Sequence, residues 1–249
     1  MRSAQQRLVP RPVARAQRTR QVAVHARRVW LFDLDNTLHD ASHAIFAHID
    51  KAMTQAVRQT LGVDAAEANA LRTKYWKRYG ATAIGMARHH GVDLGHFLRC
   101  SHDFDVAAMV RAERGLAKAL CALPGRKVLI TNAPLHYAKA VLRHLNLLRH
   151  FDSLWRIEEM RMHGEFRPKP SAALLRYVLA REGVPAARAV LVEDTLDNLR
   201  SARAVGLRTV HVFHPGTPFS RVRFQRPAYV DLRVNSIRDL LLRRRPLRG

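Results

Sequence analysis

The feature that most constrains the fold is a short apolar run, starting at Val29, that ends in two aspartates separated by one residue, Asp33 and Asp35. Such a run is typical of a strand buried on both faces of a parallel sheet, and ligands bind beyond the carboxyl ends of such strands. Two carboxylates this close repel each other unless a cation or a shared proton lies between them. A hard divalent metal prefers oxygen ligands and suits this position. The alternative is a helix cap or a turn, since Asp is common in both.

Two later segments place further polar side chains beside similar elements. The next β-rich run ends in Thr131 and Asn132, and Pro134 follows where a helix can begin. A hydroxyl and backbone N–H groups there can bind an anion, although an ordinary N-cap is the alternative for Thr131. Lys169 lies between two prolines, just before a predicted helix over residues 172–181. The prolines indicate a stiff extended segment that could direct the ammonium group into a site; the alternative is a solvated surface lysine.

A fourth segment repeats the pattern of the first. The apolar run from Ala189 ends in Glu193 and Asp194, before a predicted helix over residues 196–205 that Gly206 closes. Capping is the alternative here, because carboxylates at a helix N-terminus complement the helix dipole. Glu193 and Asp194 nevertheless place two carboxylates close together at the end of a strand, as Asp33 and Asp35 do.

In their order, these four segments resemble the four motifs of the haloacid dehalogenase superfamily, over residues 30–212. The resemblance implies an α/β fold, with a Rossmann-like doubly wound parallel sheet core and an inserted α-helical cap domain. It implies that Asp33 is the nucleophile and that Asp35 is the general acid and base, with a backbone carbonyl that also contacts the metal. The resemblance further implies that Thr131, Asn132 and Lys169 bind the phosphate group. It implies that Mg²⁺ is bound by Asp33, Asp35 and Asp194, with Glu193 as an accessory ligand.

Physical chemistry supports these roles. Phosphoryl transfer depends mainly on positioning and charge neutralisation. Asp33 would form a covalent aspartyl-phosphate, which splits one difficult step into two. Asp35 would protonate the leaving alkoxide and then deprotonate the water that hydrolyses the intermediate. The presence of Asp35 argues against the halide-displacing branch, which by resemblance lacks this residue, but not against phosphomutases, which retain it.

The stretch between the first two motifs is too long for a simple strand connection and has helical patterns. A helix from Ile45 ends at Gly62, and a capping-box variant at Asp64 opens another that runs to Tyr79. Further helices are predicted over residues 82–89 and 106–120, and near the C-terminus a strand over 228–230 and a helix over 237–242. The predicted organisation is a basic flexible arm (1–28), a catalytic core (29–40 and 122–218), a helical cap (41–121) and a basic C-terminal extension (219–249).

The cap sequence narrows the expected substrate. The stretch from Lys74 to Gly80 and the pair His89-His90 resemble the cap of the pyrimidine 5′-nucleotidases of this superfamily. Tyr75 and Tyr79 share a helix face, so the pair could stack on a base or form part of the hydrophobic core. The expected function is a Mg²⁺-dependent phosphatase of small phosphomonoesters, with pyrimidine nucleoside 5′-monophosphates as the substrates. The alternative enzyme is a phosphatase or phosphomutase acting on phosphoglycolate or sugar phosphates.

The charge of the chain suggests a non-enzymatic alternative. Formal net charge is +23, from 43 basic and 20 acidic residues. Residues 1–28 hold eight Arg and no acid, and residues 219–249 hold nine Arg against two Asp. Such ends could contact nucleic acid nonspecifically, so a nucleic-acid-binding protein on an inactive phosphatase fold is the alternative to an enzyme.

Compartment and partners follow from what the chain contains. No run approaches a transmembrane span, and Cys100 and Cys121 are too isolated for a disulfide framework. We therefore expect a cytoplasmic protein whose partner is a small phosphorylated metabolite, a nucleotide by the resemblance, and not a membrane. The Arg-rich N-terminus also allows an organelle transit peptide, but Pro10 and Pro12 interrupt the helix that such a peptide needs.

Overall fold

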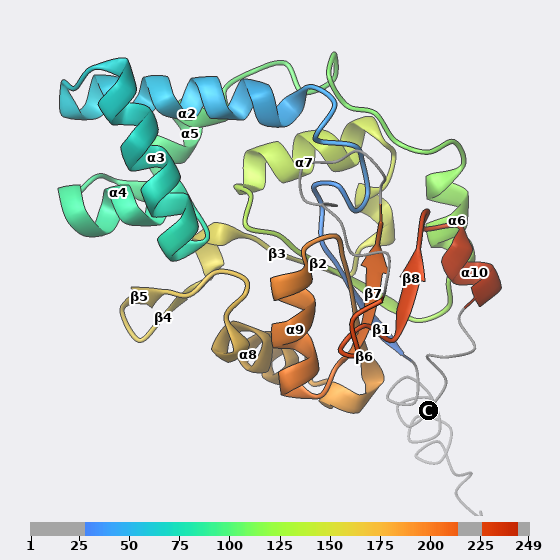
Figure 1. The fold of residues 1–249 in the computed structure, drawn as a ribbon. Helices are drawn as coiled ribbons and strands as arrows, with labels where there is room; N and C mark the ends of the chain where they lie inside the picture. The colour runs from blue at the N-terminus through green and yellow to red at the C-terminus, as the bar shows by residue number, and fades with distance from the viewer. Residues whose placement is uncertain (1–27, 214–225, 244–249) are drawn as a thin grey trace, which may run out of the picture.

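The computed structural model describes residues 28–213 and 226–243. Its centre is a six-stranded sheet in the order β3-β2-β1-β6-β7-β8, in which every pair of neighbours is parallel. The strands are β1 (Val29–Phe32), β2 (Arg126–Ile130), β3 (Ser153–Trp155), β6 (Ala189–Glu193), β7 (Arg208–Val212) and β8 (Leu232–Val234). Helices cover both faces of this sheet (Figure 1), which confirms the predicted α/β doubly wound fold.

Strand β1 shows why the apolar run folds this way. All four of its residues are buried, and alternate side chains enter different hydrophobic clusters. Trp30 and Phe32 pack on one face of the sheet with residues of α6 (Leu116–Ala122) and α7 (Leu135–His144). Val29 and Leu31 pack on the other face with residues of α8 (Ala172–Glu182) and α9 (Leu196–Val205). The alternation follows from the two-residue repeat of a strand, and a strand covered on both faces can be apolar throughout.

The helices of the core connect these strands. Helices α6 and α7 lie on one side of the sheet and α8 and α9 on the other (Figure 1). Their bounds are α6 (Leu116–Ala122), α7 (Leu135–His144), α8 (Ala172–Glu182), α9 (Leu196–Val205) and α10 (Asp239–Arg243). Between β3 and α8 the chain forms a small antiparallel hairpin of β4 (Arg161–Met162) and β5 (Glu165–Phe166). The predicted helices after the second, third and fourth motifs are therefore confirmed.

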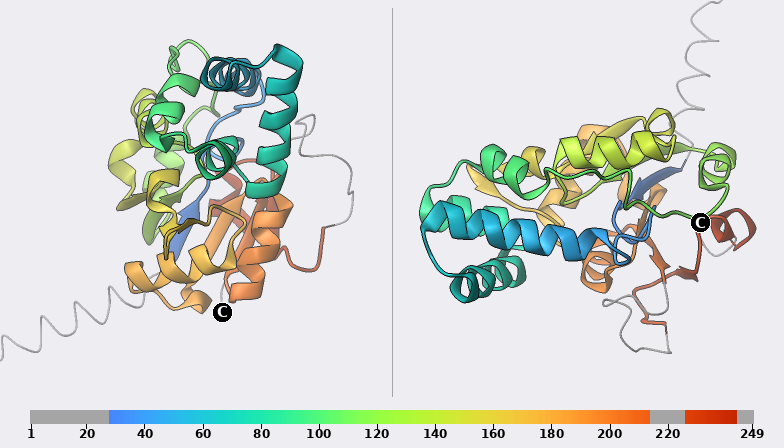
Figure 2. Two further views of the ribbon diagram at one scale, coloured as in Figure 1. Left: turned by 90° about the vertical axis from the view of Figure 1, so that its left-hand side faces the viewer. Right: turned by 90° about the horizontal axis from the view of Figure 1, so that it is seen from above.

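The long stretch after the first motif forms four helices to one side of the sheet (Figure 2). They are α2 (Ile45–Leu61), α3 (Ala65–Tyr79), α4 (Thr82–His90) and α5 (Leu94–Ser101). Asp64 caps α3 as predicted, because its side chain accepts a hydrogen bond from the backbone N–H of Glu67 at 2.8 Å. The four helices share a hydrophobic cluster that is separate from those of the sheet and that includes Val57, Tyr75, Met86 and Phe97. None of the described helices is long and apolar enough to cross a membrane.

Three local predictions were wrong. The segment predicted as one helix over residues 106–120 contains turns until Gly115, and only Leu116–Ala122 is helical. Gly115 has a left-handed backbone with φ of +79°, which interrupts a right-handed helix. The last strand lies at Leu232–Val234 and not at 228–230, because residues 228–229 form a turn. The final helix starts at Asp239, two residues later than predicted.

The basic ends fall largely outside the description. The predicted N-terminal arm lies outside the described residues except for Arg28. Residues 226–243 of the predicted C-terminal extension are described, and β8 within them pairs with β7 as the sixth strand of the sheet. Helix α10 also contributes Leu240 to the hydrophobic cluster on the α7 side. This part of the extension is therefore integral to the sheet domain.

Candidate active site

The candidate residues meet at the carboxyl ends of three neighbouring strands. Asp33 directly follows β1, Thr131 follows β2 and Glu193 ends β6. The pairing register places Phe32 of β1 opposite Leu129 of β2 and Val192 of β6. Because parallel strands end at the same edge of the sheet, three segments that are distant in the sequence bring their polar residues to one place.

Lys169 lies at the centre of this place. Its Nζ donates to Oδ1 of Asp33 at 2.6 Å and to Oε2 of Glu193 at 2.7 Å. All three residues are buried, with exposed fractions of 4% for Lys169, 6% for Asp33 and 1% for Glu193. The segment between the two prolines thus directs the ammonium group inward as predicted, and the alternative of a solvated surface lysine is wrong.

Burial of so many acids perturbs their protonation. Burial raises the pKa of Asp33 to about 7, and the Glu193 carboxylate adds to this rise while Lys169 opposes it. Burial also raises the pKa of Asp194 well above its usual range, with Glu193 as the next cause. Burial alone would lower the pKa of Lys169, but the charges of Asp33 and Glu193 outweigh burial and raise it. One ammonium group therefore lies among three carboxyl groups, which would carry an excess of negative charge if all three were ionised.

This excess suits a hard divalent cation. Oxygen atoms of Asp33, Glu193 and Asp194 all lie within 4.8 Å of one another. Carboxylate oxygens are the ligands that Mg²⁺ prefers, and two positive charges would neutralise the acids that Lys169 leaves uncompensated. The donor set therefore fits the metal that the sequence predicted. The carboxylate of Asp35 is not a member of this group, and a contact between its backbone carbonyl and the metal stays a prediction.

The carboxylate of Asp35 belongs to a second group that the sequence did not reveal. Its Oδ1 accepts hydrogen bonds from the hydroxyl of Tyr137 at 2.6 Å and from Nε2 of His39 at 2.9 Å. Burial raises the pKa of Asp35, but these bonds outweigh burial and leave the pKa below its usual value. Burial, reinforced by Asp35, raises the pKa of Tyr137 well above its usual value, so the hydroxyl stays a donor. The only sequence signal for Tyr137 is its place on the apolar face of a predicted helix, which also fits ordinary core.

The two residues after β2 have different partners. Thr131 is buried, and its hydroxyl accepts a hydrogen bond from the backbone N–H of Ala133 at 3.1 Å. Helix α7 begins only after Pro134, so Thr131 is not its N-cap. Both ends of the Asn132 amide bind the backbone of Lys169: Oδ1 accepts from its N–H and Nδ2 donates to its carbonyl, each at 3.0 Å. Asn132 therefore holds the segment that carries the ammonium group, and direct binding of phosphate by its side chain stays a prediction.

The helical insertion contacts the same segment through Gly80, the residue that ends α3. Its φ is +75°, and a Cβ atom on Gly80 would lie 2.8 Å from the carbonyl oxygen of Lys169. Real Cβ contacts essentially never approach so closely, so this junction requires glycine for its backbone conformation and for space.

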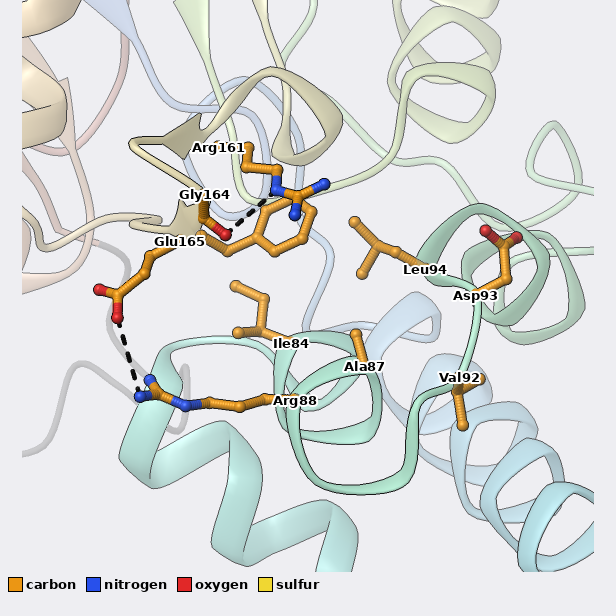
Figure 3. A pocket seen from close by; sticks show the side chains of 10 residues that line it. Ile84, Ala87, Arg88, Val92, Asp93, Leu94, Arg161, Gly164 and Glu165 are labelled. Atoms are coloured by element: carbon orange, nitrogen blue, oxygen red, sulfur yellow. Dashed lines mark hydrogen bonds and ion pairs between the residues drawn. The ribbon is translucent and has the colours of Figure 1, made fainter.

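A cavity of about 500 Å³ lies elsewhere, between α4 and the β4–β5 hairpin (Figure 3). Arg88 and Glu165 face each other across it at 3.9 Å, and Arg161 lies against the ring of Phe166 on the hairpin side. None of the candidate catalytic residues lines this cavity.

Comparisons with known proteins identify the family of this chain. The model of the haloacid dehalogenase-like hydrolases matches residues 28–206. A phosphoglycolate phosphatase of Pseudomonas syringae pv. tomato is 29% identical over 226 residues, which cover 82% of this chain and 76% of that protein. Phosphate metabolism protein 8 of Saccharomyces cerevisiae is 25% identical over 200 residues and 76% of this chain, but this chain spans only 62% of its length.

Solved structures show the same fold at low sequence identity. CbbY from Rhodobacter sphaeroides, in complex with phosphate, superimposes with a TM-score of 0.60 at 21% identity, over 86% of this chain and 96% of that chain. A haloacid dehalogenase-type phosphatase from Thermococcus onnurineus gives a TM-score of 0.58 at 18% identity, over 86% and 95% of the two chains. The match of the family model to most of the chain, the shared fold and the order of the four motifs lead to one conclusion: this protein belongs to the haloacid dehalogenase-like hydrolases.

Proposed function

We propose that this protein is a Mg²⁺-dependent phosphatase that hydrolyses small phosphomonoesters through an aspartyl-phosphate at Asp33. The observation that carries the proposal is the pair of contacts that Lys169 makes with Asp33 and Glu193 inside a buried group of acids. A nucleophilic carboxylate beside a fixed cation and an oxygen-rich metal site provides the charge neutralisation that phosphoryl transfer needs. When bound, Mg²⁺ would offset the negative charge of the acids and of the phosphate group.

The residues divide the reaction into two displacements. In the first, a carboxylate oxygen of Asp33 attacks phosphorus, the bond from phosphorus to the ester oxygen breaks, and the protonated form of Asp35 donates its proton to the departing oxygen. The negative charge of a bound phosphate group favours this protonated form, against the hydrogen bonds that lower the pKa of Asp35 in the free protein. In the second, Asp35 takes a proton from water while the water oxygen attacks phosphorus, and the bond from phosphorus to Asp33 breaks to release inorganic phosphate. Lys169 holds the phosphate oxygens near Asp33 and Thr131 supplies its hydroxyl to them.

For the substrate class we favour phosphoglycolate and small sugar phosphates over pyrimidine nucleotides. The named bacterial relatives are phosphoglycolate phosphatases, 25–29% identical over most of this chain, which does not support the narrower resemblance to pyrimidine 5′-nucleotidases. The two tyrosines of α3 in the helical insertion also offer little free ring surface. Tyr75 is 4% exposed and lies against Gly85, while Arg78 and Arg88 lie over the ring of Tyr79. A base would have to displace these groups before it could stack.

A substrate panel tests the proposal. Purified protein is incubated with phosphoglycolate, several sugar phosphates, UMP and CMP, with and without Mg²⁺, and released phosphate is measured. We expect Mg²⁺-dependent release that is fastest from phosphoglycolate or a sugar phosphate, and loss of release in Asp33→Asn. Faster release from UMP or CMP would restore the nucleotide assignment, and conversion of a sugar phosphate without release of phosphate would indicate a mutase. Absence of turnover across the whole panel would contradict the proposal.

The basic charge of the chain motivates one alternative, a nucleic-acid-binding protein on an inactive phosphatase fold. Salt-sensitive binding of DNA or RNA by a protein that turns over no phosphate ester would favour a nucleic-acid-binding role. The buried pairing of Lys169 with Asp33 and Glu193 supports the enzyme instead, because a protein that only binds nucleic acid by charge has no need of acids crowded in its interior.

A further inference from the structure

The two hydrogen bonds to Asp35 converge on one oxygen of its carboxylate. Both the Tyr137 hydroxyl, at 2.6 Å, and His39 Nε2, at 2.9 Å, bind Oδ1. The other oxygen, Oδ2, has no hydrogen-bond donor among residues 28–213 and 226–243, and 19% of the Asp35 side chain is exposed. The carboxylate is therefore held from one side, with its second oxygen available on the other.

Both donors are rigidly supported. Tyr137 is fully buried on α7, where its ring lies edge-on to the ring of His102 at 5.6 Å. His39 is 3% exposed, and its backbone forms a bridge with that of Asp35. Within this short loop the backbone N–H of Leu38 also binds the carbonyl of Leu34 at 2.9 Å. A helix and a closed loop, far apart in the sequence, thus hold the same carboxylate oxygen.

We propose that Tyr137 and His39 are positioning residues, which fix the Asp35 carboxyl so that Oδ2 meets the leaving-group oxygen of the substrate and then the attacking water. This inference rests on the proposed phosphatase function. A general acid works only within hydrogen-bond reach of its target, and a carboxyl with a free torsion spends much of its time away from that geometry. Binding both donors to Oδ1 selects one orientation and keeps Oδ2 clear.

The test exploits the chemistry of the leaving group. In Tyr137→Phe, which removes only the hydroxyl, we expect kcat/KM for phosphoglycolate to fall about tenfold to a hundredfold, a part of what general acid catalysis contributes. For p-nitrophenyl phosphate we expect less than about a threefold change, because p-nitrophenolate leaves without protonation and kcat/KM reports this first displacement. A defect of packing alone would reduce both values equally.

A matched control shows whether the loss comes from the contact with Asp35 or from removing any buried tyrosine hydroxyl. Tyr229→Phe also removes a buried hydroxyl, one that has no hydrogen-bond partner among the described residues, and Tyr229 packs with the α8 and α9 cluster on the opposite face of the sheet from Tyr137. We expect Tyr229→Phe to match the wild type with both substrates. Thermal unfolding of each variant, followed by circular dichroism, shows whether the fold is retained.

The second donor gives an independent measurement. His39→Gln keeps an N–H that can reach Asp35, whereas His39→Leu keeps bulk but has no donor, so the glutamine variant should retain more activity toward phosphoglycolate than the leucine variant. In the background of Asp35→Asn, Tyr137→Phe should cause little further loss, because residues that act as one unit are not additive. These variants keep the inference testable if one of them folds poorly.

The outcomes are distinguishable. If the wild type turns over no ester of the substrate panel and no p-nitrophenyl phosphate, the proposed function is wrong and the positioning role is overturned with it. If the wild type and its dependence on Asp35 are as expected but Tyr137→Phe loses activity equally toward both esters, or adds its full loss to Asp35→Asn, only the positioning role is overturned. Selective loss toward phosphoglycolate, rescue by His39→Gln and a non-additive double variant support it.

Discussion

Replacing Lys169 by methionine removes the cation from the centre of the acidic group and keeps much of its volume. The wild-type ammonium group binds Asp33 and Glu193 at 2.6 and 2.7 Å, and all three side chains are at most 9% exposed. Removing one partner of a buried ion pair costs about 3–5 kcal/mol, because the remaining charge stays buried without compensation. Because the three side chains are buried, solvent does not screen the ion pairs between them. We therefore expect this cost at pH 8 without Mg²⁺.

The same variant should be less destabilised in acid. Burial already raises the pKa of Asp33 to about 7, and removal of Lys169, which opposes this rise, moves the pKa further upward. A carboxyl group whose pKa is raised by folding contributes stability below its unfolded pKa near 4 and loses that contribution as the pH rises through its folded pKa. The difference in free energy of unfolding between wild type and Lys169→Met should therefore grow between pH 5 and pH 8.

Urea denaturation followed by tryptophan fluorescence measures this difference at both pH values. Lys118→Met is the control, because Lys118 is an exposed lysine of α6 and its replacement should change stability by no more than about 0.5 kcal/mol. Equal free energies of unfolding for wild type and Lys169→Met at pH 8, or a deficit that does not change with pH, would refute the charge-compensation argument.

Three further predictions concern the nucleophile, the metal and the junction with the insertion. Asp33→Asn should abolish phosphate release from every ester, because a neutral amide does not attack phosphorus; measurable steady turnover in an assay of phosphate release would contradict this. Mg²⁺ should raise the thermal unfolding midpoint more at pH 8 than at pH 5, because Asp33, whose pKa is raised to about 7, must lose its proton to bind metal; calorimetry showing equal shifts at both pH values would argue against Asp33 as a ligand. Gly80→Ala should lower both stability and phosphatase rate by more than Gly62→Ala, because both positions have positive φ, which costs alanine about 1–2 kcal/mol, but only Gly80 would place its Cβ against the Lys169 carbonyl; equal thermal midpoints and rates for the two variants would show that this contact is unimportant.

Strand-end residues could be predicted because their signal is local. A buried strand such as β1 has a continuous apolar sequence. The first polar residue after it, Asp33, marks the edge of the sheet where ligands bind. The same reasoning located Asp194, whereas Lys169 was located by the two prolines that flank it. The helix after Pro134 was also correct, because its start and its periodicity both lie in the local sequence. The pairing of these segments in space follows from the parallel sheet.

Residues that act through distant contacts could not be predicted in this way. Tyr137 resembles any aromatic residue on the buried face of a helix, and only the fold places its hydroxyl beside Asp35, 102 positions earlier in the chain. The segment before Gly115 is apolar enough to resemble a helix, but its residues pack in the core as turns. The substrate class could not be predicted from the sequence either, because the burial of Tyr75 depends on how α3 and α4 meet at Gly85.

The position of β1 in the sheet has a consequence for how the chain folds. Strand β1, which the proposed nucleophile Asp33 follows, comes first among the described strands, yet its neighbours β2 and β6 begin only at Arg126 and Ala189. Contacts of such long sequence separation form slowly, because closing long loops costs entropy before pairing returns any stability. The helices of the insertion make mostly local contacts and can assemble earlier. While β6 is still unpaired, β1 therefore has one exposed apolar edge, and Glu193 and Asp194 cannot yet join Asp33.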